Sequence, residues 1–290
     1  MNMRFALKII LIFLLFFSCS EDNDDFDPIT LNLSYEDQTT TKKGVAFGVS
    51  SIDSWDYRLT TLNAKWHYSW NWELQENYPE AVEFVPMIWG SNNTSGDIMG
   101  AIQTLYQNGD ITHLLGFNEP DLASQANMTV DQAVDLWSRL EDTGATLGSP
   151  VTAAPLNSWM TDFMTRASDE NLQVDFVAVH WYGPPNPTNF INKINEVFDQ
   201  YQKPIWITEF AVRDPDATTI ENNQYSPEQV LEFMEAVLPE LEEMEFVHRY
   251  SWFSTSTSNE NYAKTATSVL IDDDNQITPL GEFYANFTED

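Results

Sequence analysis

The stretch "HLLGFNEPDL", residues 113–122, decides how the rest of the chain is interpreted. It begins as an apolar run typical of a buried strand and ends with Asn118, Glu119, Pro120 and Asp121. The simplest interpretation is a strand followed by a Pro-Asp turn. Glu119 stands where the apolar pattern has barely stopped. It is therefore either a turn residue that faces water or one part of a functional site.

Seven further apolar, β-rich runs surround this stretch. They occupy residues 44–50, 64–70, 83–89, 145–151, 175–182, 203–210 and 246–253. Segments of helical pattern lie between them. The clearest are 96–109, 129–144, 188–202 and 226–244, and the weaker ones are 53–63 and 73–82. Eight strands that alternate with helices predict an α/β fold, a single (β/α)8 TIM barrel, which typically takes about 250 residues. A doubly wound open sheet is the competing architecture, but "GVSSIDSW" after the first strand lacks the spaced glycines of a phosphate-binding turn.

The composition restricts the partners that the protein can have. Its 290 residues include 13 Lys and Arg against 45 Asp and Glu, a formal net charge of -32. Such an excess of negative charge argues against binding to nucleic acid or to an anionic membrane surface. It suits a neutral ligand and a soluble exterior. We expect one domain that acts as a monomer, because no internal linker or repeat interrupts the alternation.

The N-terminus indicates export. Residues 1–19 form a basic start and a short apolar run that ends at Cys19, the only cysteine. "LLFFSC" resembles a bacterial lipobox, so we expect a lipoprotein-type signal peptide, lipidation of Cys19 and an anchor in the membrane. The acidic "SEDNDDFD" that follows resembles the signal for the outer face of the outer membrane, and a plain secretory peptide is the alternative. Residues 20–42 are predicted to be an acidic flexible tether, and residues 43–290 the folded domain.

Polar and aromatic residues gather at the predicted carboxyl ends of the strands, where a barrel places its chemistry. Two are carboxylates, Glu119 after the fourth strand and Glu209 in "WITEFA" on the seventh. A carboxylate between apolar runs is costly unless it has a partner. Two carboxylates that face each other over a barrel mouth suit glycoside hydrolysis, which needs an acid and an ionised partner on either side of one bond. The remaining candidates are Asn71, Trp72, Trp89, Asn118, His180, Tyr182 and Trp252.

An ordered set of motifs makes the resemblance specific. "FVPMIWG", "LLGFNEPD", "QANMT", "LGSP", "VDFVAVHWYG" and "KPIWITEFA" together resemble glycoside hydrolase family 128, the Asl1-like catalytic domain of the clan A retaining barrel glycosidases. The resemblance runs from about Lys43 to the C-terminus. It implies a retaining hydrolase of β-1,3-glucan, such as laminarin or curdlan, with Glu119 as acid/base and Glu209 as nucleophile. We expect endo action.

The other candidates receive roles as parts of a sugar-binding pocket. Asn118 can donate its amide to the sugar 2-hydroxyl, a contact that strengthens in the transition state. His180 and Tyr182 lie two apart on one strand and therefore on one face, and the resemblance makes them pocket residues. The alternative is that both are core residues. Trp72, Trp89 and Trp252, with Asn71 beside them, are expected to contact a neutral sugar, the three tryptophans by stacking.

Other functions fit the residues less well. The four histidines lie far apart and no HExxH or GxSxG motif occurs, so we expect neither a metal nor another cofactor nor a serine nucleophile. A surface glycan-binding barrel without turnover remains one alternative. The same hydrolytic machinery acting on another β-glycan remains the second, because a fold does not determine a substrate.

Overall fold

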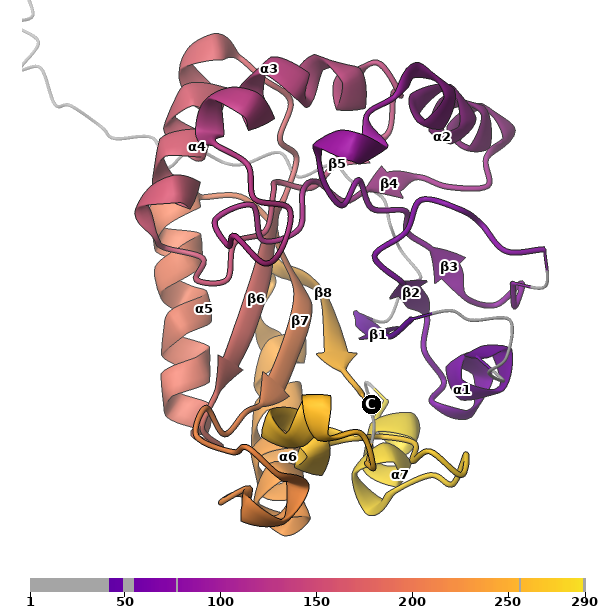
Figure 1. Ribbon diagram of the computed structural model, residues 1–290, viewed down its shortest axis with the longest axis vertical. Coiled ribbons are helices and arrows are strands. Elements are labelled where there is room, and N and C mark those ends of the chain that lie inside the picture. Colours follow the sequence, from indigo (N-terminus) through magenta and orange to yellow (C-terminus); the bar gives the residue numbers. More distant parts are fainter. Residues whose placement is uncertain (1–41, 49–54, 77, 256, 289–290) are drawn as a thin grey trace, which may run out of the picture. The chain divides into compact units, whose positions relative to one another are not determined.

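The protein is described from a computed structural model, which covers residues 42–48, 55–76, 78–255 and 257–288 (Figure 1). The predicted signal peptide, Cys19 and almost all of the predicted tether lie outside the described residues. No helix in the described part is long and apolar enough to cross a membrane.

Eight parallel strands form two sheets. The six-stranded sheet has the order β3-β2-β1-β8-β7-β6, and a two-stranded sheet joins β4 to β5. The strands are β1 Lys43–Ala46, β2 Trp66–Tyr68, β3 Glu83–Phe84, β4 His113–Leu114, β5 Thr146–Leu147, β6 Val177–Gly183, β7 Ile205–Val212 and β8 Val247–Phe253. All eight predicted strands are thus present, and the fold is α/β with a mostly parallel sheet.

The strands of the first half are much shorter than predicted. Pro86 and Pro150 lie within the predicted strands 83–89 and 145–151 and have no N–H to donate to a ladder. Gly116 marks a close approach of two backbones, because a Cβ there would lie 2.9 Å from the backbone of Ser149 and Pro150. The chain therefore runs on beyond β3, β4 and β5 with isolated bridges, such as Met87 to Leu115, in place of regular pairing.

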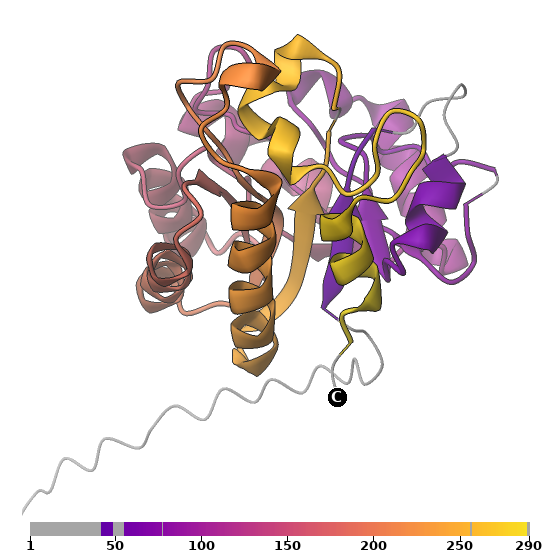
Figure 2. The same cartoon turned by 90° about the horizontal axis from the view of Figure 1, so that it is seen from below.

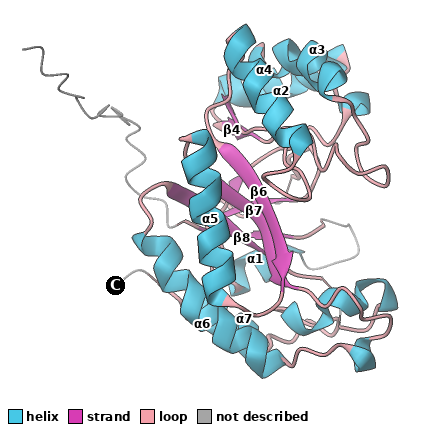
Figure 3. Cartoon of the chain, turned by 90° about the vertical axis from the view of Figure 1, so that its left-hand side faces the viewer, coloured by secondary structure: helices cyan, strands magenta, loops and turns pink. Residues whose placement is uncertain are grey.

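Helices cover the outside of the strands (Figure 3). The α-helices are α1 Trp55–Thr61, α2 Gly96–Asn108, α3 Val130–Glu141, α4 Ser158–Glu170, α5 Pro187–Tyr201, α6 Pro227–Glu243 and α7 Pro279–Asn286, and the 3-10 turns are η1 Ser91–Asn93, η2 Ile220–Asn222 and η3 Glu260–Ser268. Capping decides several boundaries. Thr129 caps α3 and Ser226 caps α6, each in a capping box with the glutamine three residues later.

One predicted helix is wrong. Residues 73–82 contain no helix among those described, and the chain there forms turns and extended backbone. Pro79 interrupts the segment, and a proline in a helix interior removes a hydrogen bond and clashes with the preceding turn. The predicted helix 53–63 is present as the shorter α1.

The core lies between the strands and the helices around them. Figure 3 shows α5 and α6 along the outer side of β6, β7 and β8, and their apolar faces bury Phe190, Phe233 and Val237 against those strands. Every residue of β7 is buried. This packing gives β7 a fixed position in the sheet, which matters because β7 carries Glu209.

Candidate active site

Glu119 is held at the carboxyl end of the fourth strand by its backbone. Its N–H donates to the carbonyl of Val151, at 2.7 Å, and its carbonyl accepts from Leu122 N, at 3.0 Å, which closes the predicted Pro-Asp turn. Its φ is +41°, a conformation that non-glycine residues rarely adopt. Strain of this kind is kept where the surrounding structure imposes it, often at functional sites.

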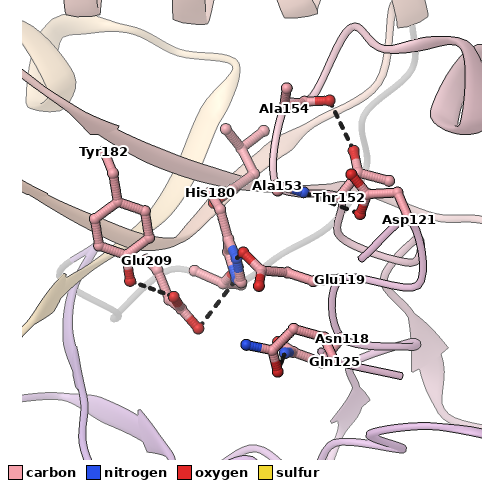
Figure 4. Close-up of polar contacts among 12 residues, drawn as sticks. Asn118, Glu119, Asp121, Gln125, Thr152, Ala153, Ala154, His180, Tyr182 and Glu209 are labelled. Carbon is pink, nitrogen blue, oxygen red and sulfur yellow. Dashed lines mark hydrogen bonds and ion pairs between the residues drawn. The ribbon is translucent and has the colours of Figure 1, made fainter. Parts of the chain in front are cut away.

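The turn after Glu119 is fixed by Asp121. Its carboxylate accepts hydrogen bonds from Ala153 N, at 3.2 Å, and from Asn157 Nδ2, at 2.9 Å (Figure 4). Asn157 in turn caps the N-terminus of α4. Asp121 therefore connects the turn that carries Glu119 to the segment before α4.

Glu209 is almost completely buried, with 5% of its surface exposed, and its carboxylate is surrounded by donors. Oε1 accepts from Tyr68 Oη, at 2.9 Å, and from Trp70 Nε1, at 2.7 Å. Oε2 accepts from Tyr182 Oη. These three hydrogen bonds satisfy both carboxylate oxygens and fix the orientation of the side chain.

His180 lies between the two glutamates. It is the cross-strand neighbour of Glu209 in the pairing of β6 with β7. Its Nδ1 lies 3.3 Å from Glu119 Oε1 and its Nε2 lies 3.2 Å from Glu209 Oε1 (Figure 4). The second contact is close enough for charge attraction but is not aligned as a hydrogen bond. One imidazole thus contacts both carboxylates.

The charge of the two carboxylates decides the protonation of His180. Burial by itself lowers the pKa of a histidine, but the negative charges of Glu209 and Glu119 outweigh burial here and raise the pKa of His180 above its ordinary value. His180 can therefore carry a positive charge between the two carboxylates.

Aromatic rings surround the carboxylate of Glu209. The ring of Trp70 meets those of Tyr68 and Phe253 edge-on, at centroid distances of 5.4 and 5.9 Å, and Phe253 meets Tyr182 in the same way at 5.3 Å. Burial, followed by the charge of Glu209, raises the pKa of Tyr182 and of Tyr68 well above the ordinary value. Both hydroxyls therefore stay protonated and remain donors.

Asn118 has hydrogen-bonding capacity to spare. Its side chain is buried, its Nδ2 makes one long contact of 3.5 Å with Gln125 Oε1, and its Oδ1 has no hydrogen-bond partner among the described residues. An unsatisfied buried amide oxygen beside a carboxylate suggests a position completed by a ligand hydroxyl.

A cavity of about 680 Å³ opens over these groups. Glu119 and Asn118 line it from the side of the fourth strand, and Glu209 and Tyr182 from the side of β6 and β7. Its other lining residues are Trp70, Trp89, Leu122, Gln125, Ala153, Arg213, Phe253, Asn261, Tyr262, Lys264 and Thr265. The size is within the range of small-molecule sites.

The structure brings together most of the predicted site residues. Glu119, Glu209, Asn118, Tyr182 and Trp89 line the cavity, and His180 lies behind the two glutamates.

Three predicted sugar contacts lie elsewhere. Trp252 is fully buried, donates its indole N–H to Ser268 O and packs on Phe210, so it has no exposed face for a sugar. Trp72 packs on the core near α2 and α3, and Asn71 uses its side-chain oxygen to accept from the backbone N–H of Trp72. Neither Asn71 nor Trp72 lines the cavity.

Sequence reasoning missed two donors to Glu209, Tyr68 and Trp70. Trp70 follows the end of β2 with a φ of +58°, a conformation that the sequence does not reveal, and its indole N–H points at the carboxylate. Tyr68 lies within β2 and resembles any core aromatic in the sequence. No three His, Cys, Asp or Glu side chains of the described residues gather as a metal site.

Known proteins resemble this chain in sequence and in structure. The sequence profile described as "Glycosyl hydrolase catalytic core" matches residues 44–284. A family 128, subgroup I, endo-β-1,3-glucanase from Amycolatopsis mediterranei, crystallised as a glutamate variant with laminarihexaose, is 33% identical with a TM-score of 0.73 over 85% of this chain and 99% of that one. No curated protein sequence gave a match.

Two other subgroups of the same family have similar structures. A subgroup II endo-β-1,3-glucanase from Pseudomonas viridiflava is 30% identical, with a TM-score of 0.68 over 86% of this chain and 98% of that one. A subgroup V exo-β-1,3-glucanase from Cryptococcus neoformans is 25% identical, with a TM-score of 0.66 over 84% of this chain and 98% of that one.

Proposed function

This chain belongs to the glycosyl hydrolase catalytic core family and to glycoside hydrolase family 128, and from that premise we propose that it is a retaining, endo-acting β-1,3-glucanase. The observation that carries the proposal is the contact of Glu119 and Glu209 with one imidazole beneath a single cavity. Endo action is favoured because the subgroup I and II relatives, at 33% and 30% identity, are endo-β-1,3-glucanases.

The ligand is proposed to be a neutral β-1,3-glucan chain. The subgroup I relative from Amycolatopsis mediterranei has been crystallised with laminarihexaose, laminaripentaose and laminaritriose. Trp89 and Phe253 are half-buried in the cavity wall and offer flat apolar faces to pyranose rings. The free Oδ1 of Asn118 suits a sugar hydroxyl close to the bond that is cut.

In the first step, the carboxylate of Glu209 attacks the anomeric carbon while Glu119 gives its proton to the glycosidic oxygen. The bond between the anomeric carbon and that oxygen breaks, the released chain leaves with a hydroxyl, and the sugar becomes an ester of Glu209. The donors Tyr68, Trp70 and Tyr182 keep Glu209 ionised and oriented for the attack.

In the second step, Glu119, now a carboxylate, takes a proton from water. That water attacks the anomeric carbon, the ester bond to Glu209 breaks, and the product leaves with the configuration of the substrate. His180 stabilises the negative charge that stands on Glu119 between the two steps, because its Nδ1 faces that carboxylate.

The eight strands are proposed to form a closed (β/α)8 TIM barrel. Isolated parallel bridges from Met87 to Leu115 and from Gly148 to Phe176 run between the six-stranded and the two-stranded sheets at both of their edges. Closure would bring the carboxyl ends of all strands to one rim, which is consistent with a site assembled from β2, β6 and β7 together with the end of the fourth strand.

The domain limits and location rest on the sequence. We propose residues 1–19 as a lipoprotein-type signal peptide, 20–42 as a tether and 43–290 as the catalytic domain of a monomer. Lipidation of Cys19 would anchor the enzyme at the cell surface of a bacterial outer membrane, where a polysaccharide is accessible. Radiolabelled palmitate incorporated by the intact chain, and lost in Cys19→Ala, would test the anchor.

Product sizing tests the proposed activity. The protein is incubated with laminarin, curdlan, lichenan and xylan, and soluble products are separated by length. We expect oligosaccharides of several lengths from laminarin and curdlan at early times, and none from Glu209→Ala. Glucose alone as the early product would replace endo by exo action, and products only from lichenan or xylan would change the substrate. Binding of glucan without any release would support a glycan-binding protein instead.

A further inference from the structure

Two cations without a side-chain hydrogen bond or ion pair among the described residues line the active-site cavity. Arg4 and Lys8 precede the described residues, and of the eleven other Lys and Arg residues, eight make side-chain hydrogen bonds or ion pairs within the described part of the chain. The other three are Lys203, Arg213 and Lys264. Arg213 and Lys264 both line the cavity and are half-buried.

The fold places these two cations side by side. Arg213 follows β7, and its N–H donates to Gly183 O, at 2.8 Å. The next N–H, of Asp214, donates to the carbonyl of Lys264, at 2.9 Å, so the backbones of Arg213 and Lys264 are adjacent. Ser268 Oγ adds a hydrogen bond of 2.8 Å to Val212 O. The turn η3 is therefore attached to the end of β7 in a fixed position.

The neighbouring carboxylates of Asp214 and Glu260 accept hydrogen bonds from other residues. Asp214 accepts from the backbone and side chain of Gln224, at 2.8 Å each, and from Asp216 N. Glu260 accepts from Ile220 N, at 3.0 Å, which connects η3 to η2. Figure 2 shows the orange turn η2 and the gold turn η3 side by side. Glu209 shares the cavity, but its oxygens accept from three aromatic donors.

Arg213 and Lys264 line one cavity from adjacent backbones, so their positive charges repel each other, and an anion between them lowers that cost. The arrangement is unusual in a chain of net charge -32, where carboxylates outnumber cations more than threefold. Tyr262 has 42% of its surface exposed beside Lys264 and can pack on a sugar ring, and Arg guanidinium groups bind planar oxyanions with two parallel hydrogen bonds.

We propose that Arg213 and Lys264 form an anion-binding subsite that accepts a glucan carrying a carboxylate or sulfate group on a sugar unit beyond the cleavage point, on the side of Glu209. The inference rests on the proposed glucanase function and adds the substrate class. The enzyme would then cut anionic β-1,3-glucans as well as neutral ones, although its overall charge suggests neutral ligands only.

The test compares charged with neutral substrate in the same enzyme. Laminarin, lightly carboxymethylated laminarin and lightly sulfated laminarin are hydrolysed, and the ratio of kcat/KM for each charged form to that for the neutral form is measured. We expect the combined variant Arg213→Gln/Lys264→Gln to lower this ratio at least about tenfold, the effect of lost charge-assisted hydrogen bonds. The difference should shrink as salt is raised. A lower ratio with only one derivative identifies the preferred anion.

Lys203→Gln is the matched control, because it removes one unpaired positive charge outside the cavity. Its ratio should equal that of the wild type. The subsite would be overturned if the combined variant kept the wild-type ratio. It would also be overturned if Lys203→Gln lowered the ratio as much as the combined variant does.

A binding experiment separates this inference from the proposed activity. In the Glu209→Gln background, calorimetry measures the affinity for sulfated and for neutral laminarihexaose, with and without Arg213→Gln/Lys264→Gln. If the wild type never hydrolyses neutral laminarin, but sulfated hexaose binds and the combined variant weakens that binding, the activity fails and the subsite stands. If the wild type hydrolyses laminarin, but sulfated hexaose binds equally well with and without the combined variant, the subsite fails and the activity stands.

Discussion

Two glutamate–histidine pairs in this protein have nearly the same contact distance and different surroundings. At the amino ends of the strands, His113 Nδ1 lies 3.2 Å from Glu83 Oε1, and Arg249 completes the group with a contact of 2.7 Å to Glu83 Oε2. At the carboxyl ends, His180 Nδ1 lies 3.3 Å from Glu119 Oε1. The first pair has a cation as its third member, and the second has another carboxylate.

The third member decides what each pair does. Burial would raise the pKa of Glu83, but His113 and Arg249 outweigh it and hold the pKa at about 2, so Glu83 is charged at neutral pH. Arg249 also stacks on Trp206, 4.2 Å from the ring centroid. In the other pair, Glu209 in place of an arginine raises the pKa of His180. The first group stabilises the fold, and the second places a histidine that can gain and lose a proton between two carboxylates.

Removal of the proposed nucleophile should have the largest effect on activity and little on stability. We expect Glu209→Gln to lower kcat/KM on laminarin by roughly 10⁴- to 10⁶-fold, the scale of a deleted nucleophile. The melting temperature should not fall, because the amide removes a buried charge and keeps a similar shape. Reducing-sugar assays and calorimetry measure the two effects. A variant that loses its fold together with its activity would make Glu209 a structural residue like Glu83.

Glu119→Gln should have the next largest effect, and its size should depend on the leaving group. We expect a loss of roughly 10²- to 10⁴-fold on laminarin, which needs a proton on the departing oxygen. An aryl β-glucoside oligomer with an acidic phenol needs no such proton in the first step, so that step should be slowed much less. Pre-steady-state release of the phenol measures it. Equal losses on both substrates would argue against Glu119 as the acid.

The group at the amino ends should show the opposite pattern. We expect Arg249→Met to lower the free energy of unfolding by up to about 3 kcal/mol, because it removes the cation of a carboxylate with only 23% of its side chain exposed. The activity of the folded fraction should remain. Arg166→Met is the control, since Arg166 forms an exposed ion pair with Asp131, and its effect should be small. Urea unfolding measures both variants.

The same group predicts an acid-dependent loss of stability. The folded pKa of Glu83 is below its unfolded value, so its contribution is complete above about pH 4.5 and disappears as the pH falls toward about 2. Glu83→Gln should flatten this part of the pH profile of unfolding. A profile as steep as that of the wild type would place the acid sensitivity on other carboxylates.

A single hydroxyl around Glu209 should matter less than the carboxylates. Tyr182→Phe removes the only hydrogen bond that Glu209 Oε2 accepts among the described residues. We expect kcat to fall about 10- to 100-fold, the value of one charge-assisted hydrogen bond, with little change in melting temperature. Tyr201→Phe, which loses a hydrogen bond to Pro155 O away from the cavity, is the control and should keep its activity.

The strand pattern predicted the two carboxylates and Tyr182, but not Tyr68 and Trp70, which also donate to Glu209. Glu119 and Glu209 follow from counting strands, because each breaks an apolar run at a strand end. The choice between Trp252 and Phe253 depends on which residue faces the interior, and a shift of one residue reverses the answer. The pairing of β7 with β8 shifts register between Ile207 and Phe210, which the sequence does not reveal.

Two further features depended on contacts between distant parts of the chain. Nothing local in the sequence indicates that Tyr68 donates to a carboxylate 141 residues away. The composition predicted a neutral ligand because the charge was averaged over the whole chain. The hydrogen bond from Asp214 to Lys264 brings Arg213 and Lys264 together at one point, and an average cannot show such a local exception.

The substitution His180→Gln should have the smallest effect on activity at the optimum pH of the enzyme. Its effect on the shape of the pH profile should be the most specific. The raised pKa of His180 means that it holds its proton above the ordinary histidine value of about 6.5 and loses it as the pH rises further. Charged His180 lies 3.3 Å from Glu119 and stabilises its carboxylate form, so activity should fall on the basic side as this charge is lost. His180→Gln has no such charge to lose. This basic-side fall in kcat should therefore be absent from the variant, with a loss of roughly tenfold or less at the optimum.

The pH dependence of the unfolding free energy tests the protonation of His180 in a second way. The contribution of charged His180 is complete below the unfolded pKa and is lost as the pH rises through the higher folded pKa. The unfolding free energy of the wild type should therefore decline over this range, while that of His180→Gln should not. A basic limb of kcat unchanged in the variant would show that the charge of His180 does not act on Glu119. The contact at 3.3 Å would then be structural, as it is between His113 and Glu83.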